Sequence, residues 1–199
     1  MELTYPAGSS LPSLIKTPLT TPISGSRFTI YQMVRKIEVV PHNSDWENQY
    51  HIEAKQIAFV LNRELVEIHH IGSTAINGIF AKPIIDVLGV VRNIVDIDRL
   101  NERMAIIGYR AMGEYGIKGR RFFMKGTDEL RICHLHIFQL SNPRITEYLY
   151  FRNYLIANPK EAQKYSDVKR RLAQMYPHDI DKYMDGKDSF IKNVIQATY

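Results

Sequence analysis

The chain has 199 residues, 45% of them hydrophobic, and a formal net charge of +5 at neutral pH. That is enough for one domain with a full apolar core, or for one domain and a small appendage. The basic excess favours anionic ligands such as nucleotides, phosphorylated metabolites or RNA. The single cysteine, Cys133, excludes an internal disulfide and a cysteine-based zinc cluster, and no apolar run approaches the roughly 18 residues of a membrane span. We therefore expect a cytoplasmic protein without a membrane partner.

Residues 1–33 are rich in proline, serine and threonine and show the periodicity of neither a helix nor a strand. We expect a disordered tail. Translation that begins at Met33 is an alternative explanation of the same pattern. Both are favoured over a targeting peptide, because the short apolar stretches fit no secretory signal.

The first elements of the core follow this tail. Residues 34–40 form a candidate edge strand that ends at Pro41. Ser44 and Glu47 have the spacing of a capping box, in which each side chain binds the other residue's backbone amide. Apolar residues then recur at helical spacing, so a helix is expected from Ser44 to about Asn62, with one face against a sheet.

Two central strands are expected next, at residues 65–71 and 83–91. The second is apolar on both faces, which is typical of a strand inside a sheet, and Asp86 is the only charge in it. A helix that ends at Gly108 follows.

The rest of the predicted sheet lies between residues 109 and 140. A short strand is expected at residues 109–112, and a hairpin turn at residues 126–128 joins a strand at 120–125 to one at 130–140. Because side chains alternate along a strand, His134 and His136 should lie on the same face.

From Pro143 onward the composition changes to that of helices. Three amphipathic helices are expected, the second beginning at Asn158 and the third covering about residues 187–197. The sequence thus predicts an α/β (α+β) protein, with a small mixed-sheet core at residues 34–142 and a helical segment at residues 143–199 packed on it.

Asp86 and the loop Gly72-Ser73-Thr74 are the first candidate site. An acid in a strand of Ile, Val and Leu is costly to bury unless it is paired, hydrogen-bonded or bound to a metal. The loop offers backbone amides and two hydroxyls to a phosphate. The alternatives are an ordinary turn, and a carboxylate that caps a loop or pairs with a nearby lysine or arginine. We favour the phosphate site.

His134 and His136 are the second candidate group. Two imidazoles on one strand face, with Asp86 on a neighbouring strand, would make a two-histidine, one-carboxylate metal set. Magnesium or manganese is the expected ion, and the histidines would also suit zinc. Histidines that are merely hydrogen-bonded are an equally good interpretation. His70, just before the loop, is a supporting residue of the same site.

Three basic residues near these groups are candidates for phosphate binding. Lys82 closely precedes Asp86, whereas Arg120 and Arg121 follow a glycine-rich loop and offer bidentate geometry. Alternation places the two arginines on opposite faces, so only one is expected to face a site. A solvated basic edge strand is the alternative. Nucleic acid is not an expected partner, because tyrosines at helical spacing are more often core than base-stacking residues.

Several motifs, taken in order, carry a resemblance to a known family. They are His-His-Ile-Gly-Ser-Thr-Ala-Ile-Asn-Gly-Ile, Ala-Lys-Pro-Ile-Ile-Asp, Gly-Tyr, Arg-Arg-Phe-Phe, His-Leu-His-Ile-Phe and Phe-Arg-Asn-Tyr-Leu. Over about residues 35–197 the chain resembles the GrpB family, a branch of the nucleotidyltransferase superfamily. The resemblance implies a small mixed α/β core followed by helices. In the wider superfamily a Gly-Ser loop precedes a strand with two metal-binding acids.

The match to that superfamily pattern is incomplete. The Gly72-Ser73 loop and Asp86 fit it, but Leu88 stands where the second acid belongs. One function that the resemblance implies is metal-dependent nucleotidyl transfer, with Asp86 and His136 as catalytic residues. The other is a binding module that recognises a nucleotide or phosphorylated small molecule without catalysis, beside a partner enzyme such as a dephospho-coenzyme A kinase.

Overall fold

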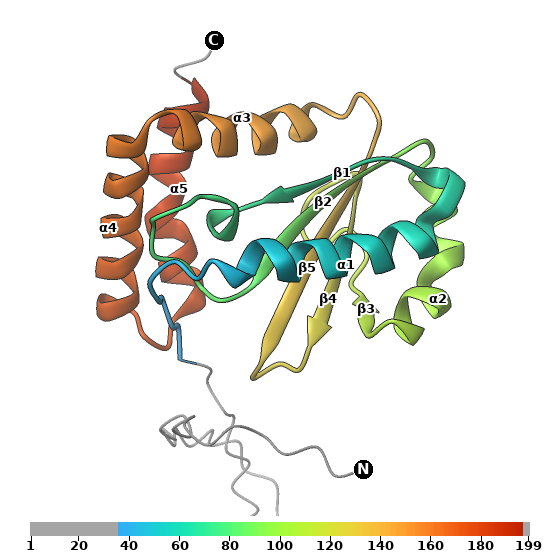
Figure 1. The fold of residues 1–199 in the computed structure, drawn as a ribbon, viewed down its shortest axis with the longest axis horizontal. Coiled ribbons are helices and arrows are strands. Elements are labelled where there is room, and N and C mark those ends of the chain that lie inside the picture. The colour runs from blue at the N-terminus through green and yellow to red at the C-terminus, as the bar shows by residue number, and fades with distance from the viewer. Residues whose placement is uncertain (1–35, 197–199) are drawn as a thin grey trace, which may run out of the picture. The chain divides into compact units, whose positions relative to one another are not determined.

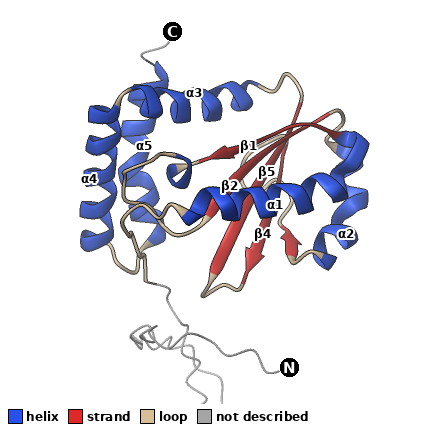
Figure 2. Cartoon of the chain, viewed as in Figure 1, coloured by secondary structure: helices blue, strands red, loops and turns tan. Residues whose placement is uncertain are grey.

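The structure is a computed structural model that describes residues 36–196, so the tail predicted at residues 1–33 lies outside the described residues. Two helices and five strands come first, and the described part of the chain ends in three consecutive helices (Figures 1 and 2). In chain order the helices and strands are α1 (Asp45–Leu61), β1 (Leu65–Ile71), β2 (Ile85–Val91), α2 (Asn101–Ile106), β3 (Tyr109–Ala111), β4 (Arg120–Gly126), β5 (Arg131–Gln139), α3 (Pro143–Ala157), α4 (Pro159–Met175) and α5 (Ile180–Gln196). Short 3₁₀ turns cover Asn62–Glu64, Ser73–Ala75 and Val95–Leu100.

The strands form one mixed sheet in the order β1-β2-β5-β4-β3. β2 and β5 run parallel, and the other neighbouring pairs are antiparallel. β2 lies inside the sheet, as its apolar sequence predicts. β1 lies at the edge, so the expectation that residues 65–71 form a central strand is wrong. Its exposed Val66 and Glu67 reflect that edge position.

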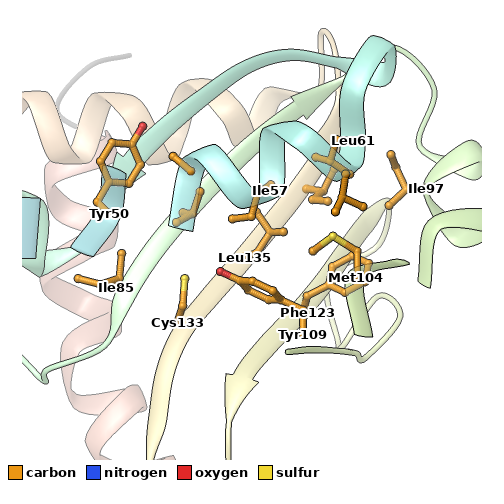
Figure 3. Close-up of a cluster of buried hydrophobic side chains, with 14 of the residues drawn as sticks. Tyr50, Ile57, Leu61, Ile85, Ile97, Met104, Tyr109, Phe123, Cys133 and Leu135 are labelled. Atoms are coloured by element: carbon orange, nitrogen blue, oxygen red, sulfur yellow. The ribbon is translucent and has the colours of Figure 1, made fainter. Parts of the chain in front are cut away.

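Helix α1 covers one face of the sheet and builds the main core there (Figure 1). Figure 3 shows Ile57 and Leu61 of α1 above Cys133 and Leu135 of β5. All four side chains are at most 1% exposed, and burial of each large aliphatic one contributes about 1.5–3 kcal/mol. Burial also raises the pKa of the Cys133 thiol to about 12, so this cysteine packs in the core as a neutral side chain.

The predicted capping box of α1 is wrong, although the helix itself is confirmed. Ser44 already has helical backbone angles and its side chain makes no capping hydrogen bond. Asn43 replaces it, because its Oδ1 accepts from the Asp45 amide at 3.0 Å. Glu47 does not cap the helix, and its Oε2 lies 3.3 Å from Nδ1 of His70.

Two further boundaries differ from the sequence prediction. In residues 36–40 the only β pairing is a single bridge between Val40 and Ala81, so this part of the expected edge strand is wrong. Helix α5 begins at Ile180 rather than near residue 187. The Asp179 carboxylate accepts from the Lys182 amide at 3.0 Å and so caps an earlier first turn.

The second face of the sheet is partly covered by α3, whose Tyr148 and Leu149 pack near Leu88 and Phe138. Helices α4 and α5 lie side by side at one end of the sheet (Figure 1). A separate apolar cluster joins α3 and α4 to the loop between β1 and β2, with Phe190 and Ile191 of α5 packed against it; its buried residues are Ile76, Ile79, Leu155, Ala162 and Tyr165. No helix in residues 36–196 has the length and apolarity needed to cross a lipid bilayer. The mixed α/β class expected from the sequence is confirmed.

Candidate functional site

The loop after β1 brings Gly72 against the carboxylate of Asp86. Gly72 has φ +71° and ψ −169°, an extended conformation at positive φ that is essentially restricted to glycine. A Cβ atom at this position would overlap Oδ2 of Asp86. The register explains the proximity, since Ile71 at the end of β1 pairs directly with Asp86 on β2. The sequence prediction that this loop and this acid lie together agrees with the geometry.

Asp86 also faces both histidines of β5. In the parallel ladder Asp86 pairs with His134, and His136 lies two residues further on the same face. Nδ1 of His134 lies 3.2 Å from Oδ1 of Asp86, within hydrogen-bond reach, whereas Nε2 of His136 lies 3.8 Å from the same oxygen. The structure thus brings together the three residues that the sequence suggested as metal ligands.

Arg120 of β4 fixes the proton arrangement of His136. Its Nη1 lies 3.2 Å from Nδ1 of His136, and the Tyr148 hydroxyl lies 3.5 Å from the same nitrogen. Because a guanidinium can only donate, Nδ1 must accept. In the neutral ring the proton therefore sits on Nε2, the nitrogen that faces Asp86.

The electrostatics of this group favour a carboxylate beside a neutral imidazole. Burial opposes the ionisation of Asp86, but its interactions with His134 and His136 outweigh burial and hold the pKa of the carboxyl below its usual range. Burial lowers the pKa of His136, and Asp86 offsets this only in part. A carboxylate with so low a pKa is a weak general base, so it suits the binding of a cation or a hydrogen-bond donor.

The described residues contain no group of three or more His, Cys, Asp or Glu side chains placed to hold a metal ion. A ligating imidazole nitrogen must present a free lone pair. On His136 one nitrogen accepts from Arg120 and the other carries the proton, whereas on His134 Nδ1 faces Asp86 and only Nε2, which is buried and makes no hydrogen bond within residues 36–196, is left. The predicted two-histidine, one-carboxylate set is therefore not preformed. The histidines position the Asp86 carboxylate.

The C-terminal helices reach the same loop from the other side. The Ser73 side chain lies close enough to the hydroxyl of Tyr165 on α4 to lower the pKa of that hydroxyl, although burial raises it more. The backbone of Phe80 is held at both polar atoms, because its amide donates to Ser166 Oγ at 2.9 Å and its carbonyl accepts from Lys169. Helix α4 thus fixes the path of the chain between Gly72 and Asp86.

His70 lies on the α1 face of the sheet, away from the group around Asp86. It stacks on Tyr50 with ring centroids 4.7 Å apart, and its Nε2 lies 3.0 Å from the Thr74 hydroxyl. The Thr74 hydroxyl is therefore engaged with His70, and the predicted role of Thr74 in phosphate binding would rest on its backbone alone. A cleft of about 420 Å³ lies beside this pair, lined by His42, Ser44, Glu47, Thr74 and Asn77.

The structure separates the two predicted arginines, as alternation requires. Arg121 lies on the α1 face and forms a bidentate pair with Asp98 at 2.6 and 2.8 Å, so it does not join the predicted phosphate site. Arg120 contacts His136 and acts through that side chain. Lys82 lies near Lys187 of α5, with both ammonium groups over the ring of Tyr183.

Sequence reasoning missed Lys187, which shares the ring of Tyr183 with Lys82, and Lys169, which lies within electrostatic range of both. A signal was available, since each interrupts the apolar stripe of an amphipathic helix. Lys169 stands between Tyr165 and Leu172 at helical spacing. A lysine in such a position is either buried or bends away to solvent, and both of these are buried.

Comparisons with known proteins agree with one another. The family model described as "GrpB protein" matches residues 36–197. The chain is 42% identical over 158 residues to the UPF0157 protein YqkA of Bacillus subtilis, a match that covers 79% of this chain but only 46% of that protein. It is 33% identical over 164 residues to the glutamate-rich protein GrpB of Alkalihalophilus pseudofirmus, with 80% and 94% covered.

A solved structure gives the same result. The crystal structure of the conserved protein GrpB from Enterococcus faecalis superposes with a TM-score of 0.77 at 41% identity, and covers 80% of this chain and 96% of that one. From its sequence and its fold, the chain belongs to the GrpB family.

Proposed function

We propose that this protein binds a nucleotide or another phosphorylated small molecule at the loop between Gly72 and Asp86, in the manner of a nucleotidyltransferase-like domain. One observation carries the proposal. The Asp86 carboxylate has a lowered pKa and lies against the backbone at Gly72, and the ammonium groups of Lys169 and Lys187 lie in its electrostatic neighbourhood. Opposite charges arranged around one loop suit a ligand that carries both signs.

A nucleotide with its counter-ion is such a ligand. Asp86 repels a bare phosphate, but it attracts the magnesium or manganese ion that accompanies a nucleoside triphosphate. Magnesium is commonly held by one or two carboxylates together with substrate phosphates, so it needs no complete set of protein ligands. When bound, the ion would neutralise phosphate charge. His134 and His136 would hold the carboxylate in place, and Ser73 would lie beside the phosphates.

Two observations favour binding without catalysis. Leu88, at the position of a second acid, is fully buried and packs in a cluster with Ile71 and Phe138. His136 does not present a free nitrogen as a general base while Arg120 donates to it. We therefore favour a recognition module that acts beside a partner enzyme such as a dephospho-coenzyme A kinase. Nucleotidyl transfer, in which an acceptor oxygen attacks the α-phosphate and pyrophosphate leaves, is the second candidate.

Calorimetry on the full chain tests the proposal. The four common nucleoside triphosphates are titrated with Mg²⁺ or Mn²⁺, and pyrophosphate release is followed in parallel. We expect binding of at least one nucleotide, and Asp86→Asn should weaken it about tenfold or more because a charge-assisted contact is lost. Asp98→Asn is the matched control, since Asp98 pairs with Arg121 on the opposite face.

Each result has a defined meaning. Binding without pyrophosphate release supports the recognition module, and release that depends on Asp86 supports transfer. If no nucleotide binds, or if Asp86→Asn binds as tightly as the wild type, the proposal fails.

A further inference from the structure

Three lysines far apart in the sequence gather beside the loop that precedes β2. Lys82 comes from the loop itself, Lys169 from α4 and Lys187 from α5. The ammonium groups of Lys82 and Lys187 both lie over the ring of Tyr183, at 5.4 and 4.8 Å from its centroid. Lys169 lies over the ring of Tyr165 at 4.6 Å. Three elements thus bring three cationic groups around two tyrosine rings.

Two of these lysines are nearly removed from water. Lys169 is 2% exposed and Lys187 is 8% exposed. Within residues 36–196 neither forms an ion pair with a carboxylate; Lys169 donates to the carbonyl of Phe80, and Lys187 contacts the Tyr183 ring. Burial of a charged group without a counter-charge is costly. A protein built only for stability would gain from apolar residues here.

The charges also act on one another. Burial and then the charge of Lys187 lower the pKa of Lys169 to about 7, and burial and then the charge of Lys82 lower the pKa of Lys187 to about 8. Asp86 is the carboxylate that favours the charged form of both, and it does not restore the usual pKa of either. The negative charge near Lys169 and Lys187 is therefore too weak to balance the positive charges of the two ammonium groups. A bound anion would supply the missing negative charge.

We propose that Lys82, Lys169 and Lys187 form the binding site of an oligophosphate group, the di- or triphosphate part of a ligand, rather than of a single phosphate or carboxylate. The inference rests on the proposed function and deepens it. A single phosphate carries at most two charges near neutral pH, which three ammonium groups exceed. A diphosphate or triphosphate carries three or four. Lysine binds phosphate as a compact point charge, and an ammonium group on a flexible stem can turn from a tyrosine ring toward an entering anion.

Helix packing gives this site a defined geometry. Lys169 lies over the ring of Tyr165, whose hydroxyl interacts with Ser73, and it also donates to the carbonyl of Phe80, so this lysine is linked to the loop. An oligophosphate at the lysines would extend toward Ser73 and Asp86. The rest of the ligand would then lie on the Asp86 side of the loop, where Arg120 holds His136 in place.

Inorganic probes test the site without assuming a nucleotide. Orthophosphate, pyrophosphate and tripolyphosphate are titrated into the full chain at constant ionic strength, with sulfate as a control for general anion effects. We expect tripolyphosphate and pyrophosphate to bind at least about tenfold more tightly than orthophosphate, and to raise the melting temperature accordingly. Equal binding of all four anions, or binding of none, overturns the inference.

Lys187→Met is the decisive variant. It removes one charge while the methionine fills a similar volume, and within residues 36–196 Lys187 makes no hydrogen bond whose loss would unfold the protein. We expect its affinity for pyrophosphate to fall about tenfold or more, whereas Lys187→Arg should retain most of it. Lys192→Met is the control on the same helix, because Lys192 is exposed and pairs with Asp188 at 2.6 Å. Unchanged pyrophosphate affinity in Lys187→Met overturns the inference.

The same measurements separate this inference from the proposed function. If a nucleoside monophosphate binds as tightly as its triphosphate and Lys187→Met binds both normally, the lysine site is wrong and nucleotide binding stands. If tripolyphosphate binds through Lys187 and no nucleotide binds, the lysine site stands and nucleotide recognition is wrong.

Discussion

The carboxylate of Asp86 occupies the space in which a side chain at Gly72 would begin. Gly72→Ala should therefore suffer both from its positive φ and from a steric overlap, and should displace Asp86 from the histidines. Gly78→Ala separates the two effects, because Gly78 also has a positive φ, +78°, but a Cβ added there would meet no atom within 4 Å. An alanine held in such a backbone conformation loses about 1–3 kcal/mol of unfolding free energy even without an overlap. Urea unfolding should show a clearly larger loss of unfolding free energy for Gly72→Ala than for Gly78→Ala. Equal losses in the two variants would contradict the close approach of Gly72 to Asp86.

Arg120 and Arg121 are neighbours in sequence with opposite surroundings. Arg120 is 5% exposed and donates to His136 and to the carbonyls of Glu114 and Tyr115. Arg120→Met should cost about 2 kcal/mol or more and should release Nδ1 of His136, which ¹⁵N NMR of the imidazole would detect. Arg121→Met loses only a partly exposed ion pair, worth at most about 1 kcal/mol, and should leave the His136 spectrum unchanged. A His136 spectrum insensitive to Arg120→Met would refute the assigned proton arrangement.

A substitution at Leu88 tests whether a second acid at this position is enough to give the site nucleotidyl-transfer activity. Leu88→Asp places a charge inside the cluster of Ile71 and Phe138, two residues from Asp86. We expect a loss of several kcal/mol in unfolding free energy and no pyrophosphate release. Leu88→Met, of similar volume, should cost less than about 1.5 kcal/mol. A stable Leu88→Asp variant that releases pyrophosphate would instead mark a catalytic site lacking only one acid.

The titration of Lys169 and Lys187 should make the unfolding free energy depend on pH. Their folded pKa values, about 7 and about 8, lie below the ordinary value of 10.5, so between these limits the unfolded chain binds more protons than the folded one. Stability of the ligand-free protein should therefore rise as pH increases from about 7 toward 10, by at most about 1.4 kcal/mol per pH unit for each lysine.

Anion affinity should show the opposite trend, because a bound oligophosphate favours the charged lysines. Pyrophosphate binding should weaken as pH rises through the same interval, by at most about tenfold per pH unit for each lysine. Asp86, Tyr165 and Tyr183 do not account for these trends. The pKa of Asp86 is lowered and those of the two tyrosines are raised, so all three lie outside this pH interval. Lys187→Met should flatten both profiles. Parallel trends for stability and affinity would show that these lysines do not contact the anion.

Local patterns predicted much of the fold. Alternation placed His134 and His136 on one face and parted Arg120 from Arg121, because a strand repeats every two residues. The helix at residues 45–61 was expected from its apolar period. Its cap was not, because Asn43 and Ser44 are equally good capping types and only the backbone angles distinguish them.

Relationships between distant segments were beyond such patterns. Nothing in the sequence of β2 states that its parallel neighbour is β5, yet that pairing sets His134 against Asp86. The edge position of β1 is likewise a property of the whole sheet. Lys169 and Lys187 become neighbours of Lys82 only through helix packing, so their spacing along the chain gives no indication of a shared site.

The hydrogen bonds between α4 and the backbone of Phe80 have a consequence for biosynthesis. Ser166 and Lys169 hold a segment translated more than eighty residues earlier. Until the ribosome has made α4, the loop before Asp86 lacks the contacts that shape it. All five strands of the sheet are therefore synthesised before this loop can take its final path, and α4 sets that path after them.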